Sequence, residues 1–418
     1  MNKRLFVSTL LIAGAMMLSS CGTNNNMKKI YEPTTSVSDK NNSYDPATLS
    51  DYSSFVCSSF KPVLINTDSK SDNPVYSPLS VYMAFSMVAE SAAGDTREAF
   101  LDVLGADDIE DLRKTNAEIF KDLAFFDKEN GDLTLANSLW FNSESAHPFN
   151  DSAIKTLSEK YNAASFYLQC SSDPDAGKKI GNWISEKTNK MLNPEIQTNS
   201  EDVLRIVNAV HFKEMWSEQF EKSNNKTAPF TNFKNEQSDC TYLTGSFETG
   251  AAKCKGYTLC ELDMANGFKM TFALPDENSS LQELMENEEK MNSILNGTDE
   301  FKTYNVNIEL PKFKIKSSFD LLQAASEMGV PVKGDYSSLF KDEGPEGIGE
   351  IVHEAMLNVD ENGCEAAAYT EILLTDGISI ADETESLDFI LNRPFFFNLT
   401  DENGTSVICG AVNDPNAE

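Results

Sequence analysis

The chain has 418 residues, and 34 Lys and Arg against 66 Asp and Glu give it a formal net charge of −32 at pH 7. Nucleic acid, heparin-like polyanions and anionic lipid surfaces bind clustered cations, so this charge argues against all three as partners. Hydrophobic residues at 40% and aromatics at 10% exclude a disordered or fibrous class. Eight Cys without a Cys-x-x-Cys pair, and three His, predict neither a disulfide scaffold nor a metal site, and we expect no cofactor.

The first twenty residues predict an export signal. Lys3 and Arg4 precede an apolar run at 5–18, which is shorter than the ~20 residues of a membrane-spanning helix. The run ends in Leu-Ser-Ser-Cys at 18–21 and resembles a bacterial lipobox, in which the Cys becomes the lipid-modified first residue. An ordinary signal peptide with a chance Cys21 is the alternative. We therefore expect an extracytoplasmic protein, lipid-anchored to the periplasmic or cell-surface face of a bacterial membrane.

The segment after this signal has the composition of a flexible linker. Residues 22–45 are rich in Asn, Ser, Thr and Lys and show almost no apolar periodicity. No second low-complexity stretch interrupts the rest of the chain. The predicted organisation is a signal peptide over 1–20, a flexible tether over 21–50 and a single domain over 51–418.

Helical patterns dominate the first half of the domain. Residues 80–89 are almost wholly apolar, which predicts a buried helix, and Gly94 is expected to end it. A second helix is predicted to open with Asp173 as N-cap and Pro174 at its first position. A third, amphipathic helix is predicted over 319–329 in the second half.

Strand patterns dominate the second half. Residues 269–275, 305–311 and 395–399 are short, alternating or rich in β-formers, and Pro or turn residues close them. Helices gathered early and strands gathered late indicate an α+β fold with mixed sheets.

Motifs for catalysis fail on inspection. Residues 377–381 fall one Gly short of a nucleophile elbow around Ser379 and lack the strand and helix that the elbow needs, although a lipid-anchored hydrolase remains the enzyme alternative. His353 would begin a His-Glu-x-x-His zinc motif, but Leu357 stands where the second His should be. We therefore predict no catalytic residues and no metal ligands.

Short segments spread along about nine tenths of the chain match one family pattern in the same order. They are residues 73–80, 94–96, 135–140, 207–213, 310–313, 392–395 and 410–415. Together they resemble the serpin family, and Trp216 also stands where that family keeps a Trp at the top of its central sheet. The resemblance implies a monomer with helices packed on a large central mixed sheet, smaller additional sheets and an exposed reactive loop.

Residues 359–370, Val-Asp-Glu-Asn-Gly-Cys-Glu-Ala-Ala-Ala-Tyr-Thr, look like the hinge of an inhibitory serpin. A strand that slides between two others needs a flexible residue at its bend, which Gly363 supplies, and small side chains on its inward face. Period-two alternation puts Cys364, Ala366, Ala368 and Thr370 inward. The predicted hinge residues are Glu361, Gly363, Cys364, Glu365, Ala366, Ala367, Ala368 and Thr370.

Other interpretations of this segment stay open. Taken alone, residues 366–368 would suit a helical turn with Glu361 and Glu365 four residues apart. Two residues also depart from the family pattern. Cys364 replaces the usual Thr or Ser, and its thiol could be oxidised. Tyr369 replaces a small residue but would face outward.

The resemblance implies a suicide mechanism. A protease attacks the exposed loop and forms an acyl-enzyme, the loop enters the central sheet as a new strand, and the uncleaved protein is metastable. It also implies a set of polar residues that hold the sheet closed. His353 has an alternative interpretation, as an ordinary core histidine whose hydrogen bonds are made within the protein. The predicted gating residues are Ser77, Ser80, Asn208, His353 and Trp216.

The cleaved bond has two predicted positions. Counting forward from the hinge puts it at Gly377-Ile378, whereas counting back from Asn392 puts it near Glu383-Thr384. We favour the forward count, because the inserted length determines how far the protease is moved. The predicted window also includes Leu374, Thr375 and Asp376.

The loop sequence also restricts the target. No Lys or Arg occurs between Cys364 and Leu391, so a trypsin-like protease has no cation to bind. Elastase-like, subtilisin-like or papain-like proteases are the expected partners. A non-inhibitory serpin that acts as a surface binding protein is the alternative function.

Overall fold

The computed structural model describes residues 27–33, 46–66, 72–123, 131–347, 351–364 and 384–417. Cys21, the hinge from Glu365 onward and both predicted positions of the bond up to Glu383 lie outside the described residues. No helix within these ranges is long and apolar enough to cross a bilayer.

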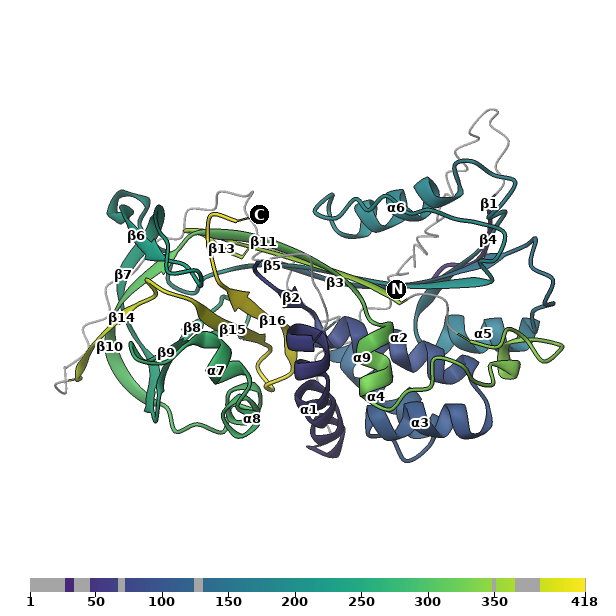
Figure 1. The fold of residues 1–418 in the computed structure, drawn as a ribbon, viewed down its shortest axis with the longest axis horizontal. Helices are drawn as coiled ribbons and strands as arrows, with labels where there is room; N and C mark the ends of the chain where they lie inside the picture. Colours follow the sequence, from purple (N-terminus) through teal and green to yellow (C-terminus); the bar gives the residue numbers. More distant parts are fainter. Residues whose placement is uncertain are drawn as a thin grey trace, which may run out of the picture.

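A large mixed sheet runs along most of the molecule (Figure 1). β3 and β4 pair in parallel, whereas the other ladders of this sheet are antiparallel. Among the described residues it has seven strands, in the spatial order β1 (Met27–Tyr31), β4 (Ala163–Leu168), β3 (Gly131–Asn142), β5 (Leu204–Met215), β13 (Gly363–Cys364), β12 (Val352–Val359) and β11 (Phe313–Asp320).

A second sheet lies at one end of the molecule, to the left in Figure 1. β6 (Lys226–Thr231) pairs with one of its strands, β7. The remaining order in the described part of the chain is β14 (Ser386–Ile390), β10 (Lys302–Pro311), β7 (Gln237–Cys254), β8 (Tyr257–Asp263), β9 (Lys269–Pro275), β15 (Phe395–Thr400), β16 (Ser406–Val412) and β2 (Val75–Tyr76).

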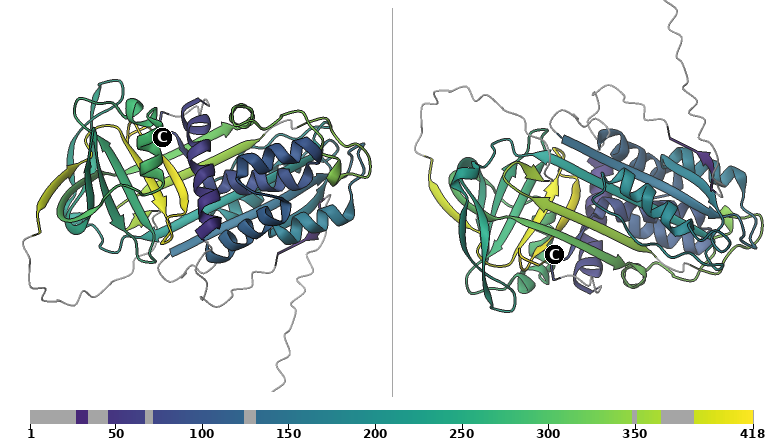
Figure 2. Two further views of the ribbon diagram at one scale, coloured as in Figure 1. Left: turned by 90° about the horizontal axis from the view of Figure 1, so that it is seen from below. Right: turned by 90° about the horizontal axis from the view of Figure 1, so that it is seen from above.

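Most helices gather under one face of the large sheet, and α6 covers the other face (Figures 1 and 2). The helices are α1 (Pro46–Phe60), α2 (Pro78–Ser91), α3 (Gly94–Leu104), α4 (Ile109–Leu123), α5 (Asp151–Lys160), α6 (Ala176–Lys187), α7 (Leu281–Met285), α8 (Glu288–Leu295) and α9 (Leu322–Glu327), with short π or 3-10 turns η1 (Lys61–Asn66), η2 (Lys222–Asn224) and η3 (Ser337–Leu339). The predicted α+β class, with helices packed on a large mixed sheet, is confirmed.

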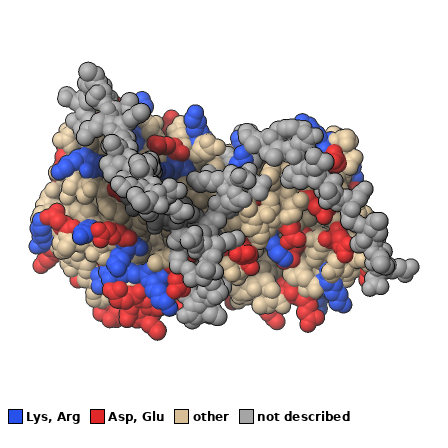
Figure 3. All heavy atoms as spheres, turned by 180° about the vertical axis from the view of Figure 1, so that it is seen from behind, with Lys and Arg blue, Asp and Glu red and all other residues tan. Residues whose placement is uncertain are grey.

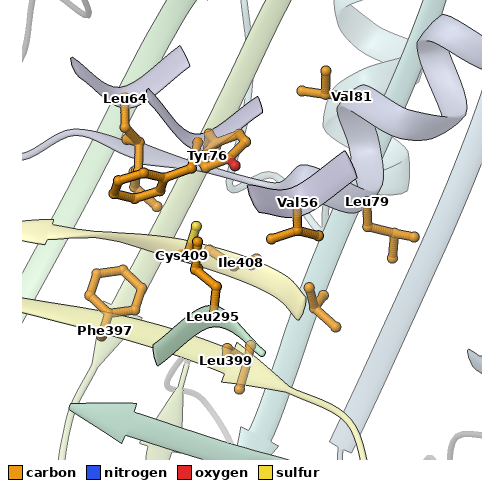
Figure 4. Packing of buried hydrophobic residues seen from close by; sticks show 14 of the residues in the cluster. Val56, Leu64, Tyr76, Leu79, Val81, Leu295, Phe397, Leu399, Ile408 and Cys409 are labelled. Carbon is orange, nitrogen blue, oxygen red and sulfur yellow. The ribbon is translucent and has the colours of Figure 1, made fainter. Parts of the chain in front are cut away.

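Two hydrophobic clusters hold these layers together. The larger one joins α1 and α2 to β2, β15 and β16, where Val56, Leu79, Tyr76, Leu399 and Ile408 pack against one another (Figure 4). The smaller one lies between α6 and the outer face of the large sheet. Its members are Ala136, Trp140, Ala164, Phe166, Leu168, Cys170, Ala176, Ile180, Trp183, Ile184, Leu192 and Ala209.

Three helix boundaries differ from the sequence-based prediction. The helix predicted over 319–329 is shorter, because Phe319 and Asp320 belong to β11 and α9 spans only Leu322–Glu327. Gly94 does not end the first helix: α2 stops at Ser91, and Gly94, with φ of 50°, opens α3. Asp173 is not the N-cap of α6, which is Asp175. The Asp173 carboxylate accepts a hydrogen bond from Asp175 N in the turn before the helix and another from Lys179 Nζ within the helix. The sequence analysis predicted mainly helices in the first half of the domain, so the long strands β3 and β5 there were not predicted.

β1 lies within the segment predicted as a flexible tether. It pairs antiparallel with β4, from Met27 opposite Leu168 to Tyr31 opposite Ser165. Met27 also packs against the cluster beneath α6. These five residues therefore form the outermost strand of the large sheet.

Candidate functional site

The predicted hinge enters the large sheet at Gly363 and Cys364, the last two of its residues that the structure describes. Cys364 lies opposite Glu214 of β5 on one side and Val359 of β12 on the other, and Gly363 lies opposite Met215. β13 is antiparallel to both neighbours. The chain therefore turns back from β12 and begins a strand between β12 and β5.

A tight hairpin turn makes this reversal. Asp360 N donates to Gly363 O at 2.9 Å, Gly363 N donates to Asp360 O at 3.3 Å, and Asn362 N donates to the Asp360 carboxylate. Trp216, only 1% exposed, holds the turn from the β5 side. Its indole Nε1 donates to Asp360 O and its backbone N donates to Asn362 O, both at 2.9 Å.

Gly363 is the residue on which this turn depends. Its φ is +152°, in the region that L side chains rarely adopt. A Cβ there would lie 2.0 Å from Glu214 O and 2.8 Å from Met215 Cα. Any side chain would push β13 away from β5, so glycine supplies the bend predicted from the sequence.

Cys364 is fully buried. Burial, together with the nearby Asp360 and Glu214 carboxylates, raises the pKa of its thiol well above the ordinary value. The nucleophilic thiolate is therefore suppressed in this conformation, which protects the residue from the oxidation considered above. All seven cysteines in the described part of the chain are free thiols.

Glu361, at the tip of the turn, belongs to a polar cluster that sequence reasoning missed. Its carboxylate accepts two hydrogen bonds from Lys312 Nζ, at 3.1 and 2.8 Å, and one from Asn225 Nδ2 at 2.5 Å. Burial alone would raise the pKa of Glu361, but the bonds from Lys312 and Asn225 outweigh it and lower that pKa. The charged carboxylate thus ties the turn to the segments before β11 and β6.

Replacing Lys312 with Met should lower the free energy of unfolding by about 2 kcal/mol at pH 7, because Glu361 would keep a mostly buried charge without its cation. Lys314→Met, at an exposed position on β11, is the matched control and should change little. The stabilisation by a carboxyl group with a lowered pKa is complete above its unfolded value and fades as pH falls through its folded value. The difference between Lys312→Met and wild type should therefore shrink below about pH 4.5, and a difference that persists there in denaturant titrations would contradict this account.

Along the large sheet beyond Cys364, on the side away from the hinge turn, no ladder joins β5 to β12 in the described part of the chain. β5 pairs with β3 and β13, and β12 pairs with β11 and β13. The large sheet is therefore joined at this position through the two residues of β13. A further strand entering here would find β5 on one side and β12 on the other.

The predicted gating residues come from both strands that flank β13 and from the start of α2. Asn208 lies on β5 and His353 on β12, whereas Ser77 is the N-cap of α2 and Ser80 lies in that helix. Ser77 N donates to His353 Nε2 at 3.1 Å, and the Ser77 hydroxyl accepts from Ser80 N while donating to Val407 O. Asn208 lies apart from them and donates to Asn137 Oδ1 at 2.5 Å. The buried Oδ1 of Asn208 has no hydrogen-bond partner among the described residues.

The structure thus brings Ser77, Ser80 and His353 together at the start of α2. Trp216 is not part of this group, because it lies at the hinge turn described above. Burial lowers the pKa of His353 to about 4, so its ring is neutral at physiological pH and Nε2 is available as an acceptor. The ring stacks on Phe319 at 6.3 Å and meets Tyr76 edge-on at 6.4 Å.

Charged side chains of both signs share the molecular surface. On the face shown in Figure 3, Lys and Arg side chains lie among Asp and Glu side chains, and no broad basic surface forms in the described residues there.

Comparison with known proteins identifies the fold. A family model described as "Serpin (serine protease inhibitor)" matches residues 50–415. Serpin-ZX of Arabidopsis thaliana is 26% identical over 84% of this chain and 94% of its own. A leukocyte elastase inhibitor of Xenopus tropicalis is 28% identical over 80% of this chain and 90% of its own. The native structure of the thermophilic serpin tengpin matches with a TM-score of 0.77 at 27% identity, covering 90% of this chain and 96% of tengpin.

The family match extends over most of the chain, and the large sheet with its hinge agrees with it. Members of this family are mostly protease inhibitors and generally not enzymes. The chain belongs to the serpin family.

Proposed function

We propose that this protein inhibits serine or cysteine proteases by trapping them through insertion of its reactive loop. The observation that carries the proposal is β13, where Gly363 and Cys364 already pair with β5 and β12. The position, direction and register of these two residues between β5 and β12 support insertion of the residues that follow as a full new strand.

An order-of-magnitude estimate of the insertion energy supports trapping. About twelve residues at ~3.3 Å each would carry an attached protease roughly 40 Å along the sheet. If each new ladder bond contributes ~1 kcal/mol net, the strand adds on the order of 10 kcal/mol before packing. That is comparable to the whole stability of a typical domain, which supports distortion of the protease active site as the way the protease is trapped.

The target is proposed from the loop sequence. The bond is placed at Gly377-Ile378, within the window that starts at Leu374, and no cation for a trypsin-like pocket lies nearby. An elastase-like, subtilisin-like or papain-like protease fits these small and aliphatic residues. The similarity to a protein named leukocyte elastase inhibitor supports the first of these classes.

The location is proposed from the N-terminal sequence. The run that ends in Cys21 supports export followed by lipid attachment at that cysteine, so the inhibitor would work outside the cytoplasm at a bacterial membrane.

Incubation with a protease panel, followed by denaturing gel electrophoresis, tests the proposal directly. An inhibitor of this kind gives a band at the summed mass of both proteins, and mass spectrometry of the released C-terminal peptide identifies the cleaved bond. A peptide that starts at Thr384 would show that the bond lies later than proposed.

Ala366→Arg should convert the inhibitor into a substrate. Continuing the alternation from buried Cys364 turns residue 366 inward in the inserted strand, where an unpaired cation costs several kcal/mol. Ala367→Arg, one residue further and outward, is the matched control and should still trap. The stoichiometry of inhibition measures the difference.

Melting before and after loop cleavage gives the second readout. Cleaved wild type should resist heat far better than uncleaved protein, because insertion completes the sheet. If the two forms melt together, the loop does not insert, and the protein is a serpin-shaped binding protein.

A further inference from the structure

We propose that β1 fixes the orientation of the domain on the membrane, with the reactive loop held away from the lipid surface. The inference rests on the lipid anchor at Cys21 proposed above, and it concerns where that anchor enters the folded domain. Its evidence is the register of five strands in the large sheet.

The sheet has a loop end and an entry end. At the loop end, Cys364 lies opposite Glu214, which lies opposite Gly131 of β3. At the entry end, Met27 lies opposite Leu168, which lies opposite Asn142 of the same strand. Eleven residues of β3 separate the two levels, a distance of about 36 Å at ~3.3 Å per residue.

The views of the whole molecule agree with this register. β1 and β4 lie at one end of the long axis, and β13, β14 and the second sheet lie towards the other (Figures 1 and 2). The chain that arrives from the N-terminus therefore joins the domain at the end opposite Cys364 and β14, the described residues on either side of the predicted reactive loop.

The chain between the anchor and β1 is short. Five residues lie between Cys21 and Met27, and these six residue-to-residue steps reach at most about 20 Å when fully extended. If β1 were not bound, the first held residue would be Pro46, and 25 residues could reach about 85 Å. Pairing of β1 with β4 thus decides whether the entry end stays next to the membrane or the whole domain turns freely.

Contacts beyond the ladder support this role for β1. Met27 packs against the cluster under α6, whereas Lys28 and Lys29 are exposed. Lys29 pairs with Glu32 on the surface at 2.8 Å. The strand therefore has one side chain, Met27, that packs on the domain, and an outer surface that exposes Lys28, Lys29 and the apolar Ile30.

Energy transfer to the membrane tests the orientation on the full-length, uncleaved protein in vesicles that contain a headgroup-labelled acceptor lipid. Uncleaved protein is required because insertion would move a trapped protease towards the entry end. A donor is introduced as a non-natural amino acid at Ala146, exposed just after β3 at the entry end, or at Glu218, exposed just after β5 at the loop end. We expect transfer about threefold higher from position 146, given the length of the sheet.

Two variants separate the strand from its charges. Lys28→Pro with Lys29→Pro removes two backbone donors and should abolish the difference between the two donor positions. Lys28→Ala with Lys29→Ala removes the same charges, keeps the ladder and should preserve the difference. Equal transfer from both positions in wild type would overturn the orientation.

Amide hydrogen exchange of residues 27–31 in detergent tests separately whether β1 is paired with β4. Protection in wild type that is lost in the double-proline variant supports the pairing of β1, and rapid exchange in wild type overturns it. Cys21→Ala should abolish transfer from both positions while protection persists. A wild type that shows protection but no membrane association overturns the orientation and the anchor together, and leaves protease trapping unaffected.

Discussion

Replacing Gly363 with Val should weaken protease trapping strongly while cleavage of the loop continues. The new side chain would overlap Glu214 O, 2.0 Å from the Cβ position, so β13 could not keep its pairing with β5. Such overpacking costs about 1–3 kcal/mol, and each 1.36 kcal/mol in the insertion step slows it about tenfold relative to deacylation. The stoichiometry of inhibition should rise accordingly, to tenfold or more.

Gly329→Val is the matched control for this variant. Gly329 also has positive φ, at +95°, but nothing lies within 4 Å of its Cβ position, and it follows α9 far from the hinge. This control should lower the melting temperature through backbone strain and still trap protease. Normal trapping by Gly363→Val would show that insertion does not pass through the observed pairing.

Acidification should destabilise the protein strongly through His353. Its pKa is about 4 in the folded protein because of burial, against 6.5 as the ordinary value. Between these values the unfolded chain binds a proton that the folded protein does not, so stability falls as pH drops from 6.5 to 4. The total loss from this one residue is about 3 kcal/mol.

His353→Gln should flatten this dependence, because an amide oxygen can accept the bond from Ser77 N without titrating. The variant should be less stable than wild type at pH 7, because the substitution removes the stacking on Phe319. The difference in stability between the two proteins should become smaller towards pH 4. Melting temperatures at a fixed scan rate from pH 7 to pH 4 measure this pH dependence of stability. If the melting temperatures of wild type and His353→Gln fall in parallel as pH drops, the role of His353 is refuted.

The sequence predicted correctly those strands and turns whose position depends on residues close together in the chain. β9 has the predicted bounds, because alternating apolar residues stop at Pro275. The bend at Gly363 was also predicted, since the conformational freedom of glycine belongs to the residue itself. The start of α6 was missed by two residues because Asp173 forms a turn with Lys179 instead of capping the helix.

Features that depend on distant pairing could not be predicted in the same way. β1 has no alternation, and its partner β4 lies more than a hundred residues away. Lys312 and Asn225 approach Glu361 from positions 49 and 136 residues away. Asn208 was grouped with His353 by resemblance, whereas its contact with Asn137 follows from the register of β5 on β3. Each of these requires the sheet order to be known first.

β1 also changes what the large sheet offers to neighbouring molecules. Without it, β4 would present a row of unpaired backbone groups, which is a template for pairing with another chain. β1 covers that row and is itself a poor template, because it is short, is irregular between Lys29 and Tyr31 and exposes two lysines. Copies of a lipid-anchored protein crowd together in two dimensions, where edge-to-edge aggregation is most favoured. If Cys21 carries the proposed lipid, the segment that follows it would thus also keep neighbouring domains from joining their sheets.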